Sequence, residues 1–289
     1  MRLGILGPLS LVSTGLQPVW DEEANSAPSA PKLRSVLTTL LVHADNVVPV
    51  PSLMSELWGD SPPSSGLTTL QTYILGLRRL LTKVTRLPAA TVSREVLVTR
   101  AGGYLFQSDS GTLDVHRYHS LLSVGWTALI RGDDEAGVGL LSEALAQWRG
   151  PALVDVPIGP ILESKRRQLE VSRQVLIEYL VDAQIRLGMY GEVLSELAAP
   201  TVENPCQEGM QAQYMRALYL SGRRSEALEV FQRLRRCLVA ELGLEPSPAL
   251  QRLHGAILEG RTDILHQLPT QRPKGEIIGS SAWSGCRVY

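Results

Sequence analysis

The sequence predicts an α+β domain followed by an all-α domain. The first third of the chain combines short alternating apolar segments with amphipathic helices, and from about residue 114 long Ala/Leu periodicities replace them. The chain has 289 residues, of which 44% are hydrophobic and only 5% aromatic, so its cores depend mainly on Leu, Val, Ala and Ile. A chain of this length is expected to form about two domains.

Residues 68–81 (TTLQTYILGLRRLL) are the most informative segment. Their apolar side chains recur at helical spacing and predict one buried stripe, formed by Leu70, Ile74, Leu77 and Leu81. The opposite face carries hydrogen-bonding and cationic side chains, the types that contact base edges and phosphates. They are Thr68, Gln71, Thr72, Arg78, Arg79 and Lys83.

Residues 96–106 (VLVTRAGGYLF) predict a β-hairpin, because alternating apolar residues flank a turn that contains Gly102 and Gly103. A helix fits the major groove of DNA, and a basic ribbon beside it can reach a neighbouring groove or the backbone. The helix and the ribbon together therefore predict a winged-helix DNA-binding module.

The charge of the chain is unevenly distributed. The formal net charge of the whole chain is −1, but residues 66–106 hold six cationic side chains and a single acidic one, Glu95, which gives this segment a net charge of +5. A local basic face matters more for DNA binding than the total charge. We therefore expect the nucleic-acid surface to lie in this segment and not in the more acidic remainder.

The region around this segment completes the predicted winged-helix domain, residues 1–108. In chain order the patterns predict short strands within 1–20 (the last at Val19-Trp20), a loop at 21–31, a helix from Pro31, an extended piece at 47–50, a short helix at 53–58 and a loop at 60–66. Gly59 is expected to end the short helix.

Residues 114–260 predict a tetratricopeptide-like array of about three helical hairpins. Gly188 and Gly222 are 34 residues apart, and buried-type residues follow each glycine at the same spacing: Val193 and Leu197 after the first, Ala227 and Phe231 after the second. A weaker third copy surrounds Gly132. The expected N-caps are Asp133, Ser225 and Ser247. Residues 261–289 lack periodicity and are predicted to form a disordered tail.

The sequence offers little support for catalysis, a metal site or a membrane span. Cys206, Cys237 and Cys286 are far apart and odd in number, so we expect reduced thiols in a cytoplasmic protein. His116 and His119 share a helical face, but a metal site needs a further ligand and none is evident. No phosphate loop, nucleophile arrangement or long apolar run stands out, and we expect no cofactor.

Several fixed phrases occur in one order along the chain. They are Leu6-Gly7-Pro8-Leu9, Leu57-Trp58-Gly59-Asp60, Thr69-Leu70-Gln71-Thr72-Tyr73, Leu77-Arg78-Arg79-Leu80-Leu81, Gly103-Tyr104-Leu105, Trp148-Arg149-Gly150-Pro151-Ala152-Leu153 and Glu241-Leu242-Gly243-Leu244-Glu245-Pro246. With these phrases the chain closely resembles the Streptomyces antibiotic regulatory proteins, in their small form. The resemblance implies an OmpR-type winged helix followed by a bacterial transcriptional activation domain.

The resemblance also implies a function. Residues 66–83 would be the recognition helix, and residues 100–106 would be the wing. Relatives activate secondary-metabolite gene clusters by binding direct repeats near promoters, as a dimer on DNA, and by holding RNA polymerase through its σ subunit and other subunits. The loop expected to face polymerase consists of Trp58, Gly59, Asp60, Ser61, Pro62, Pro63 and Ser64.

The predicted DNA-binding set combines the helix, the wing and two cations at the start of the first helix. It comprises Lys32, Arg34, Thr68, Thr69, Gln71, Thr72, Leu75, Gly76, Arg78, Arg79, Lys83 and Arg100. Lys32 and Arg34 are either phosphate clamps or solubilising surface cations. Relatives usually carry a polar residue and an arginine where this chain has Leu75 and Gly76. We hypothesise that Leu75 contacts a thymine methyl group and that Gly76 lets the helix approach DNA closely.

These observations predict a non-catalytic, sequence-specific transcription activator that is cytoplasmic and associated with the nucleoid. Its expected partners are double-stranded promoter DNA and RNA polymerase. The alternatives are a tetratricopeptide scaffold that binds peptides and, with less support, an enzyme. The basic patch formed by Lys165, Arg166, Arg167 and Arg173 is either a partner surface or a solvated helix face.

Overall fold

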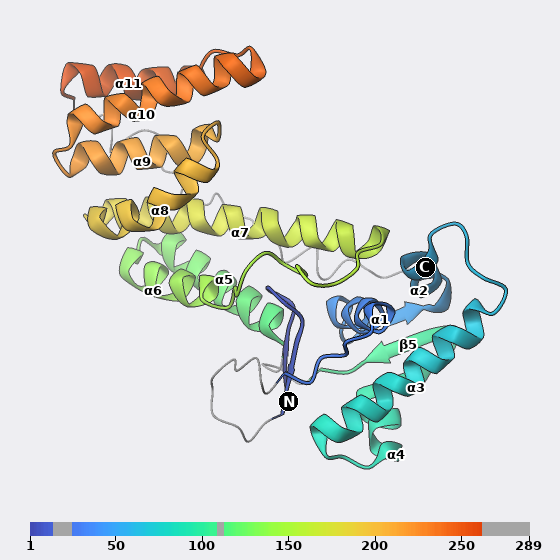
Figure 1. Cartoon of the computed structure of the whole chain (residues 1–289). Helices are drawn as coiled ribbons and strands as arrows, with labels where there is room; N and C mark the ends of the chain where they lie inside the picture. The colour runs from blue at the N-terminus through green and yellow to red at the C-terminus, as the bar shows by residue number, and fades with distance from the viewer. Residues whose placement is uncertain (14–24, 109–112, 262–289) are drawn as a thin grey trace. The chain divides into compact units, whose positions relative to one another are not determined.

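A computed structural model describes residues 1–13, 25–108 and 113–261 (Figure 1). The expected strand at Val19-Trp20, the first part of the loop at 21–31 and nearly all of the expected tail lie outside the described residues. Contacts divide the chain into two compact units. The first contains Met1–Leu121 and Ala144–Arg173, and the second contains Leu122–Glu143 and the chain from Gln174 onward.

The first unit begins with an antiparallel pair of short strands, β1 (Arg2–Gly4) and β2 (Ser10–Val12), in which Leu3 lies opposite Leu11. The leucine and isoleucine side chains of this segment are at most 1% exposed, because both strands and the turn between them pack into the core. The pair agrees with the strands predicted within 1–20.

Three helices follow in the same unit: α1 (Pro31–Val42), α2 (Val50–Trp58) and α3 (Gly66–Thr85). Pro31 occupies the first turn of α1, where its missing N–H costs nothing. Gly59 ends α2 with a positive φ of 59°. The predicted apolar stripe of α3 is buried: Leu70, Ile74, Leu77 and Leu81 are at most 2% exposed.

A three-stranded antiparallel sheet completes the winged helix. Its order is β3 (Val47–Pro49), β5 (Gly103–Phe106) and β4 (Leu97–Arg100). Between α3 and β4 lie a short helix, α4 (Ala89–Thr91), and a π-helical turn, η2 (Val92–Val96). The order of helices, hairpin and sheet confirms the predicted α+β winged-helix domain (Figure 1).

Between residues 114 and 261, the described chain forms helices joined by turns and loops. Its elements are α5 (Asp114–Arg131), α6 (Asp134–Leu145), α7 (Pro160–Arg186), α8 (Tyr190–Glu203), α9 (Glu208–Leu220), α10 (Arg224–Cys237), the π-helical turn η3 (Leu238–Leu242) and α11 (Pro248–Glu259). In the part of the chain that the structure describes, no helix is long and apolar enough to cross a bilayer.

The three glycines of the expected repeat lie in equivalent turns of the second unit. Gly132, Gly188 and Gly222 each adopt a positive φ, between 74° and 83°, at the end of a helix. The residue after each glycine donates its N–H to a carbonyl five positions earlier; for example, Met189 donates to Gln184 at 2.9 Å. This is the Schellman pattern of helix ends, which favours glycine. The tetratricopeptide-like prediction is confirmed.

Two of the three expected N-caps are confirmed. Asp133 Oδ1 accepts from the N–H of Ala136 at 3.0 Å, and Ser247 Oγ accepts from that of Leu250 at 3.4 Å. The prediction for Ser225 is wrong, because α10 begins one residue earlier, at Arg224, and Ser225 is inside the helix.

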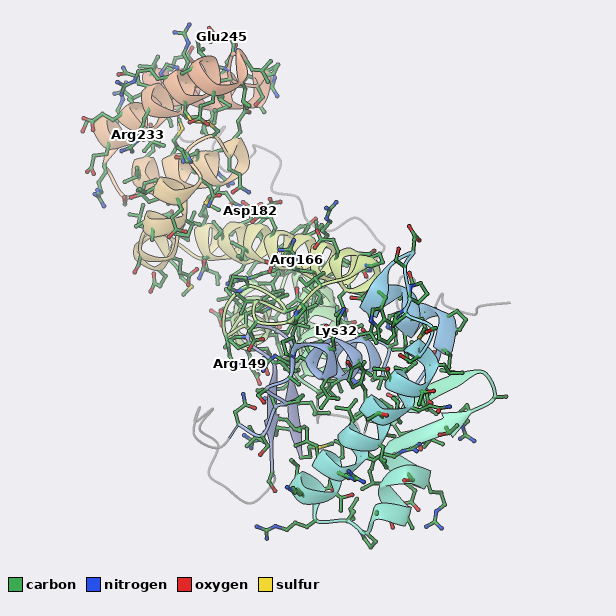
Figure 2. The ribbon with its side chains drawn as sticks, turned by 45° about the vertical axis from the view of Figure 1, so that its right-hand side comes forward. Lys32, Arg149, Arg166, Asp182, Arg233 and Glu245 are labelled. Atoms are coloured by element: carbon green, nitrogen blue, oxygen red, sulfur yellow. A yellow bond between two sulfur atoms is a disulfide. The ribbon has the colours of Figure 1, made fainter. Side chains whose placement is uncertain are left out.

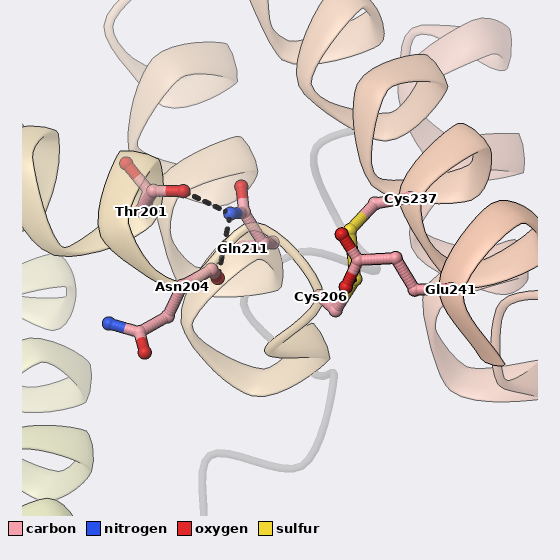
Figure 3. Close-up of a disulfide and its surroundings, with 6 residues drawn as sticks. All are labelled: Thr201, Asn204, Cys206, Gln211, Cys237 and Glu241. Carbon is pink, nitrogen blue, oxygen red and sulfur yellow. Dashed lines mark hydrogen bonds between the residues drawn. A yellow bond between two sulfur atoms is a disulfide. The ribbon is translucent and has the colours of Figure 1, made fainter.

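The prediction of reduced thiols is wrong for two cysteines, because a disulfide joins Cys206 to Cys237 (Figure 3). Cys206 precedes the start of α9, and Cys237 ends α10. These two helices pack as an antiparallel pair, so residues 31 positions apart in sequence meet at one end of it. The chain spacing alone does not show this, because it depends on how the helices pair.

Candidate nucleic-acid interface

The outward face of α3 carries six of the twelve predicted DNA-contacting residues. Every third or fourth residue is exposed, which is the spacing of one helical face. The exposed members are Thr68, Gln71, Thr72, Leu75, Arg79 and Lys83. Thr72 Oγ1 donates to the carbonyl of Thr68 at 3.0 Å and still has acceptor capacity on the exposed side. The sequence therefore places amide, hydroxyl and cationic groups on one accessible helix surface.

Arg78 has a different position from Arg79. Its Nε and Nη2 donate to the carbonyl of Leu97 at 3.0 and 2.9 Å, and Nη2 also donates to Thr99 Oγ1 at 2.8 Å. Leu97 and Thr99 are on β4, so the guanidinium links the recognition helix to the wing. Arg79 is exposed on the outward face of the helix.

The wing is a tight hairpin with an exposed cationic tip. Arg100 ends β4, and Ala101 and Gly102 form a two-residue turn in which Gly102 has a φ of 77°. Arg100, Ala101 and Gly102 are all exposed. Gly103 begins β5 at a point where a Cβ atom would lie 2.3 Å from the carbonyl oxygen of Val48, so only glycine fits beside β3. The turn thus presents Arg100 to solvent at a fixed place.

Leu75 and Gly76 differ in orientation. Leu75 is 49% exposed on the outward face, where an apolar contact to a ligand is sterically open. Gly76 is half-buried, and a Cβ atom on it would lie 3.7 Å from Cδ1 of Leu33 on α1. These neighbours favour a role for Gly76 in the packing between α3 and α1, and a DNA-facing role for it stays a prediction.

Lys32 and Arg34 are bonded within the protein. Lys32 Nζ donates to the carbonyl of Leu57, and the ammonium lies 5.9 Å from the centre of the Trp58 ring. Lys32 is labelled in Figure 2. Arg34 forms an ion pair with Asp155 and keeps a side chain that is only 15% exposed. Arg34 therefore connects α1 to Asp155 within the protein. A phosphate contact by the exposed Lys32 stays a prediction.

The loop before α3 is open to solvent. Asp60, Ser61, Pro62, Pro63 and Ser64 are all exposed, and Gly59 before them is exposed too. Trp58 is half-buried and anchors the loop at its start, while the N–H of Gly66 donates to the carbonyl of Pro63 at 2.8 Å at its end. The predicted polymerase-facing segment is thus an accessible loop held at both ends.

The other candidate cations have partners within the chain. Arg166 and Arg167 both bind Glu163 at 2.9 and 2.7 Å (Figure 2). The guanidinium of Arg173 lies 4.9 Å from the ring centre of Trp148. These contacts favour a structural helix face over a partner surface. His119 packs its ring edge-to-face on Tyr118, with centroids 5.0 Å apart.

Sequence analysis missed two carboxylates that position the winged helix. Asp114 is 5% exposed and accepts from the N–H groups of Ile5 and Leu6 at 2.9 and 3.0 Å; Arg149 also donates to it, at 3.3 Å (Figure 2). Burial raises the pKa of Asp114, and these hydrogen bonds oppose that shift. Glu56 caps the start of α7.

Two of the fixed sequence phrases meet close to Asp114. Residues 6–9 and 148–153 are adjacent in the fold: the N–H of Arg149 donates to the carbonyl of Leu6 at 2.8 Å, and Arg149 Nη1 donates to that of Pro8 at 2.9 Å. Both phrases contain a Gly-Pro dipeptide, the mark of a turn, but nothing in their separate sequences shows that they meet.

Comparison with known proteins agrees with this architecture. The family model of the bacterial transcriptional activator domain matches residues 113–258, and that of the C-terminal domain of transcriptional regulatory proteins matches residues 24–106. The regulatory protein DnrI of Streptomyces peucetius is 42% identical over 258 residues, which cover 89% of this chain and 92% of DnrI. The regulatory protein AfsR of Streptomyces griseus is 32% identical, and this chain spans only 25% of its length.

A solved structure has the same fold. The structure of Mycobacterium tuberculosis EmbR in complex with a low-affinity phosphopeptide superimposes with a TM-score of 0.80 at 30% identity, covering 94% of this chain and 68% of EmbR. Winged helix and helical array thus define a transcriptional regulator of the activator class. The chain belongs to the Streptomyces antibiotic regulatory protein family.

Proposed function

We propose that this chain activates transcription by binding double-stranded promoter DNA with α3 in the major groove and the β4–β5 wing beside it. The observation that carries the proposal is the exposed stripe on α3, with Gln71, Thr72 and Arg79 on one face, next to the exposed Arg100 of the wing. A helix of this kind reads base edges in the major groove, and flanking cations hold the phosphates.

The finer features of the proposal follow the family. Two copies would bind direct repeats near a promoter, and the exposed loop Trp58–Ser64 would face RNA polymerase, including its σ subunit. The regulated genes would belong to one antibiotic or other secondary-metabolite pathway. In this proposal the protein is not an enzyme and works at the nucleoid.

A footprint on promoters near the gene tests DNA binding directly. We expect protection of a repeated sequence, and we expect affinity to fall steeply with salt because Lys and Arg displace condensed counterions. Binding that does not exceed that of random DNA would contradict the proposal and favour the peptide-binding scaffold instead.

Arg79 and Arg78 provide a matched pair for mutation. Arg79→Ala should weaken operator binding by about 1–3 kcal/mol, as expected for loss of a groove contact, without changing stability. Arg78→Ala should instead lower the free energy of unfolding, because it removes hydrogen bonds to Leu97 and Thr99. Equal loss of affinity with no stability change in both variants would argue against the proposed orientation of α3.

The polymerase loop needs a separate test. Replacing Asp60 and Ser61 by alanine changes two exposed side chains and should leave operator binding intact. We expect lower transcript yield in a reconstituted assay with polymerase and promoter DNA. Unchanged transcription at full operator occupancy would remove the loop from the proposed polymerase contact.

A further inference from the structure

The second unit contains a cavity of about 270 Å³ between α7, α9 and α11. This is near the lower end of the volumes of small-molecule sites, about 300–1,000 Å³. Its walls combine charged, polar and apolar side chains. The lining residues used below are Glu178, Asp182, Glu208, Arg216, Leu250 and Leu253.

Arg216 is the unusual member of the wall. It is 6% exposed, and its Nη1 donates to Asp182 Oδ1 at 2.7 Å (Asp182 is labelled in Figure 2). The Nε and Nη2 atoms are also buried, yet they have no hydrogen-bond partner among the described residues. A buried guanidinium donor without an acceptor is costly, so an oxygen atom, from a water molecule or from a ligand that displaces it, would stabilise Arg216 here.

The charge of the wall selects the kind of ligand. Glu208 accepts from the backbone N–H of Ser247 at 3.0 Å, and Glu178 accepts from the side-chain amide of Gln174 at 3.3 Å. Both partners are neutral, so neither carboxylate is neutralised by them. Arg216 is already paired with Asp182. The wall therefore carries an excess of two negative charges, which disfavours an anion and attracts a cation.

The remaining wall is apolar. Leu250 and Leu253, both 2% exposed, belong to the core around α11, and Ala212 adds a small surface on α9. Tyr179 completes this side, and its ring packs against Trp126 with centroids 4.3 Å apart. A rigid apolar wall of this type suits a flat or cyclic ligand body.

We propose that this cavity binds a small organic amine with an apolar body. Its ammonium group would lie near Glu178 and Glu208, an uncharged carbonyl or hydroxyl oxygen would accept from Arg216, and its body would lie against Leu250 and Leu253. The residues of this site belong neither to α3 nor to the wing. The protein would therefore bind a small molecule in addition to the DNA binding proposed above.

Two glycines make a matched pair of variants. Gly209, the second residue of α9, lines the cavity, and a Cβ atom on it would meet only Glu178 Oε1, at 3.9 Å. Gly191, the second residue of α8, has no atom within 4 Å of such a Cβ. Gly209→Leu should fill the cavity without backbone strain, and Gly191→Leu should leave it open.

The test uses saturation-transfer NMR on the full chain, without DNA. The probe is 4-(aminomethyl)benzamide, which carries an ammonium, a ring and a carbonyl. We expect it to bind the wild type and Gly191→Leu, and binding to disappear in Gly209→Leu. Two truncated probes, 4-methylbenzamide and benzylamine, should each bind about tenfold more weakly, because each lacks one charge-assisted hydrogen bond.

Arg216→Lys separates a ligand contact from a structural role, because lysine keeps a cation beside Asp182 but lacks the guanidinium donors. In that variant 4-(aminomethyl)benzamide and benzylamine should bind equally. Absence of binding to the wild type, equal binding to Gly209→Leu, or tighter binding of the anion 4-carbamoylbenzoate would overturn the proposal. None of these results depends on DNA, so they are distinct from failure of the activator proposal.

Discussion

The carboxylate of Glu56 accepts a hydrogen bond from the backbone N–H of Ile161, 105 residues later in the chain, at 2.8 Å. The same carboxylate accepts from the N–H groups of Gly159 and Leu162 at 2.6 and 3.2 Å. Glu56 is on α2 of the winged helix, and these three groups are at the start of α7. A buried carboxylate there satisfies N–H groups that the helix leaves open and interacts favourably with its dipole.

This contact predicts that Glu56→Ala lowers the free energy of unfolding by about 2–3 kcal/mol, because three N–H groups lose a charged acceptor in a buried place. Urea denaturation of the full chain measures it. Glu163→Gln is the control: Glu163 is in the same first turn of α7, but its partners are the half-exposed Arg166 and exposed Arg167, and such solvent-exposed pairs contribute little to stability. Equal losses in both variants would contradict the assigned role of Glu56.

Features that depend on residues close together in the chain, such as those of α3, could be predicted from the sequence, whereas the contacts of Glu56 could not. The buried stripe of α3, the hairpin turn at Gly102 and the turns at Gly188 and Gly222 depend on residues within a few positions of one another, so their spacing was sufficient. The outward set on α3 followed from the same periodicity. Contacts of Glu56 and Asp114 span more than 100 residues, and one carboxylate in a helix looks like many others until the fold places it.

Gly76 shows the same limit within the candidate site. A glycine is unusual inside a helix that contacts DNA, so the sequence drew attention to Gly76. Helical periodicity alone could not show whether this side of α3 faces DNA or packs against α1. The side chain of Leu33, 43 residues earlier, is the neighbour that favours the second of these positions. Arg34 likewise looked like a surface cation because Asp155, its partner, comes 121 residues later.

Gly76→Ala is therefore expected to stabilise the protein. Alanine is favoured over glycine in a helix by about 1 kcal/mol, and its Cβ would meet Leu33 at 3.7 Å, an ordinary contact distance. Thermal unfolding should show a higher midpoint, and operator affinity should stay unchanged because the position faces α1. A marked loss of affinity in a stable variant would instead restore a DNA-facing role for this glycine.

The Cys206–Cys237 disulfide predicts the number of reactive thiols. The chain has three cysteines, so unfolded, non-reduced protein should release one equivalent in a thiol titration and three after reduction. Closing a loop of about 31 residues is expected to stabilise the folded state by roughly 4 kcal/mol. The Cys206→Ser/Cys237→Ser variant should therefore unfold at lower urea concentration than the oxidised wild type and match the reduced one. Three free thiols before reduction would exclude the bond in the purified protein.

His119 predicts how stability depends on pH. Burial, with smaller contributions from His116 and Lys165, lowers its pKa from 6.5 to about 4. Between these pH values the unfolded chain binds a proton at this position and the folded chain does not. The free energy of unfolding should therefore fall as the pH drops from 6.5 to 4, by about 3 kcal/mol from this residue.

In His119→Gln, the free energies of unfolding from urea titrations at pH 7 and pH 4.5 should differ by less than they do in the wild type. His254→Gln is the control, because His254 is more exposed and should leave most of the pH dependence in place. An identical pH dependence in His119→Gln and the wild type would show that other groups cause it.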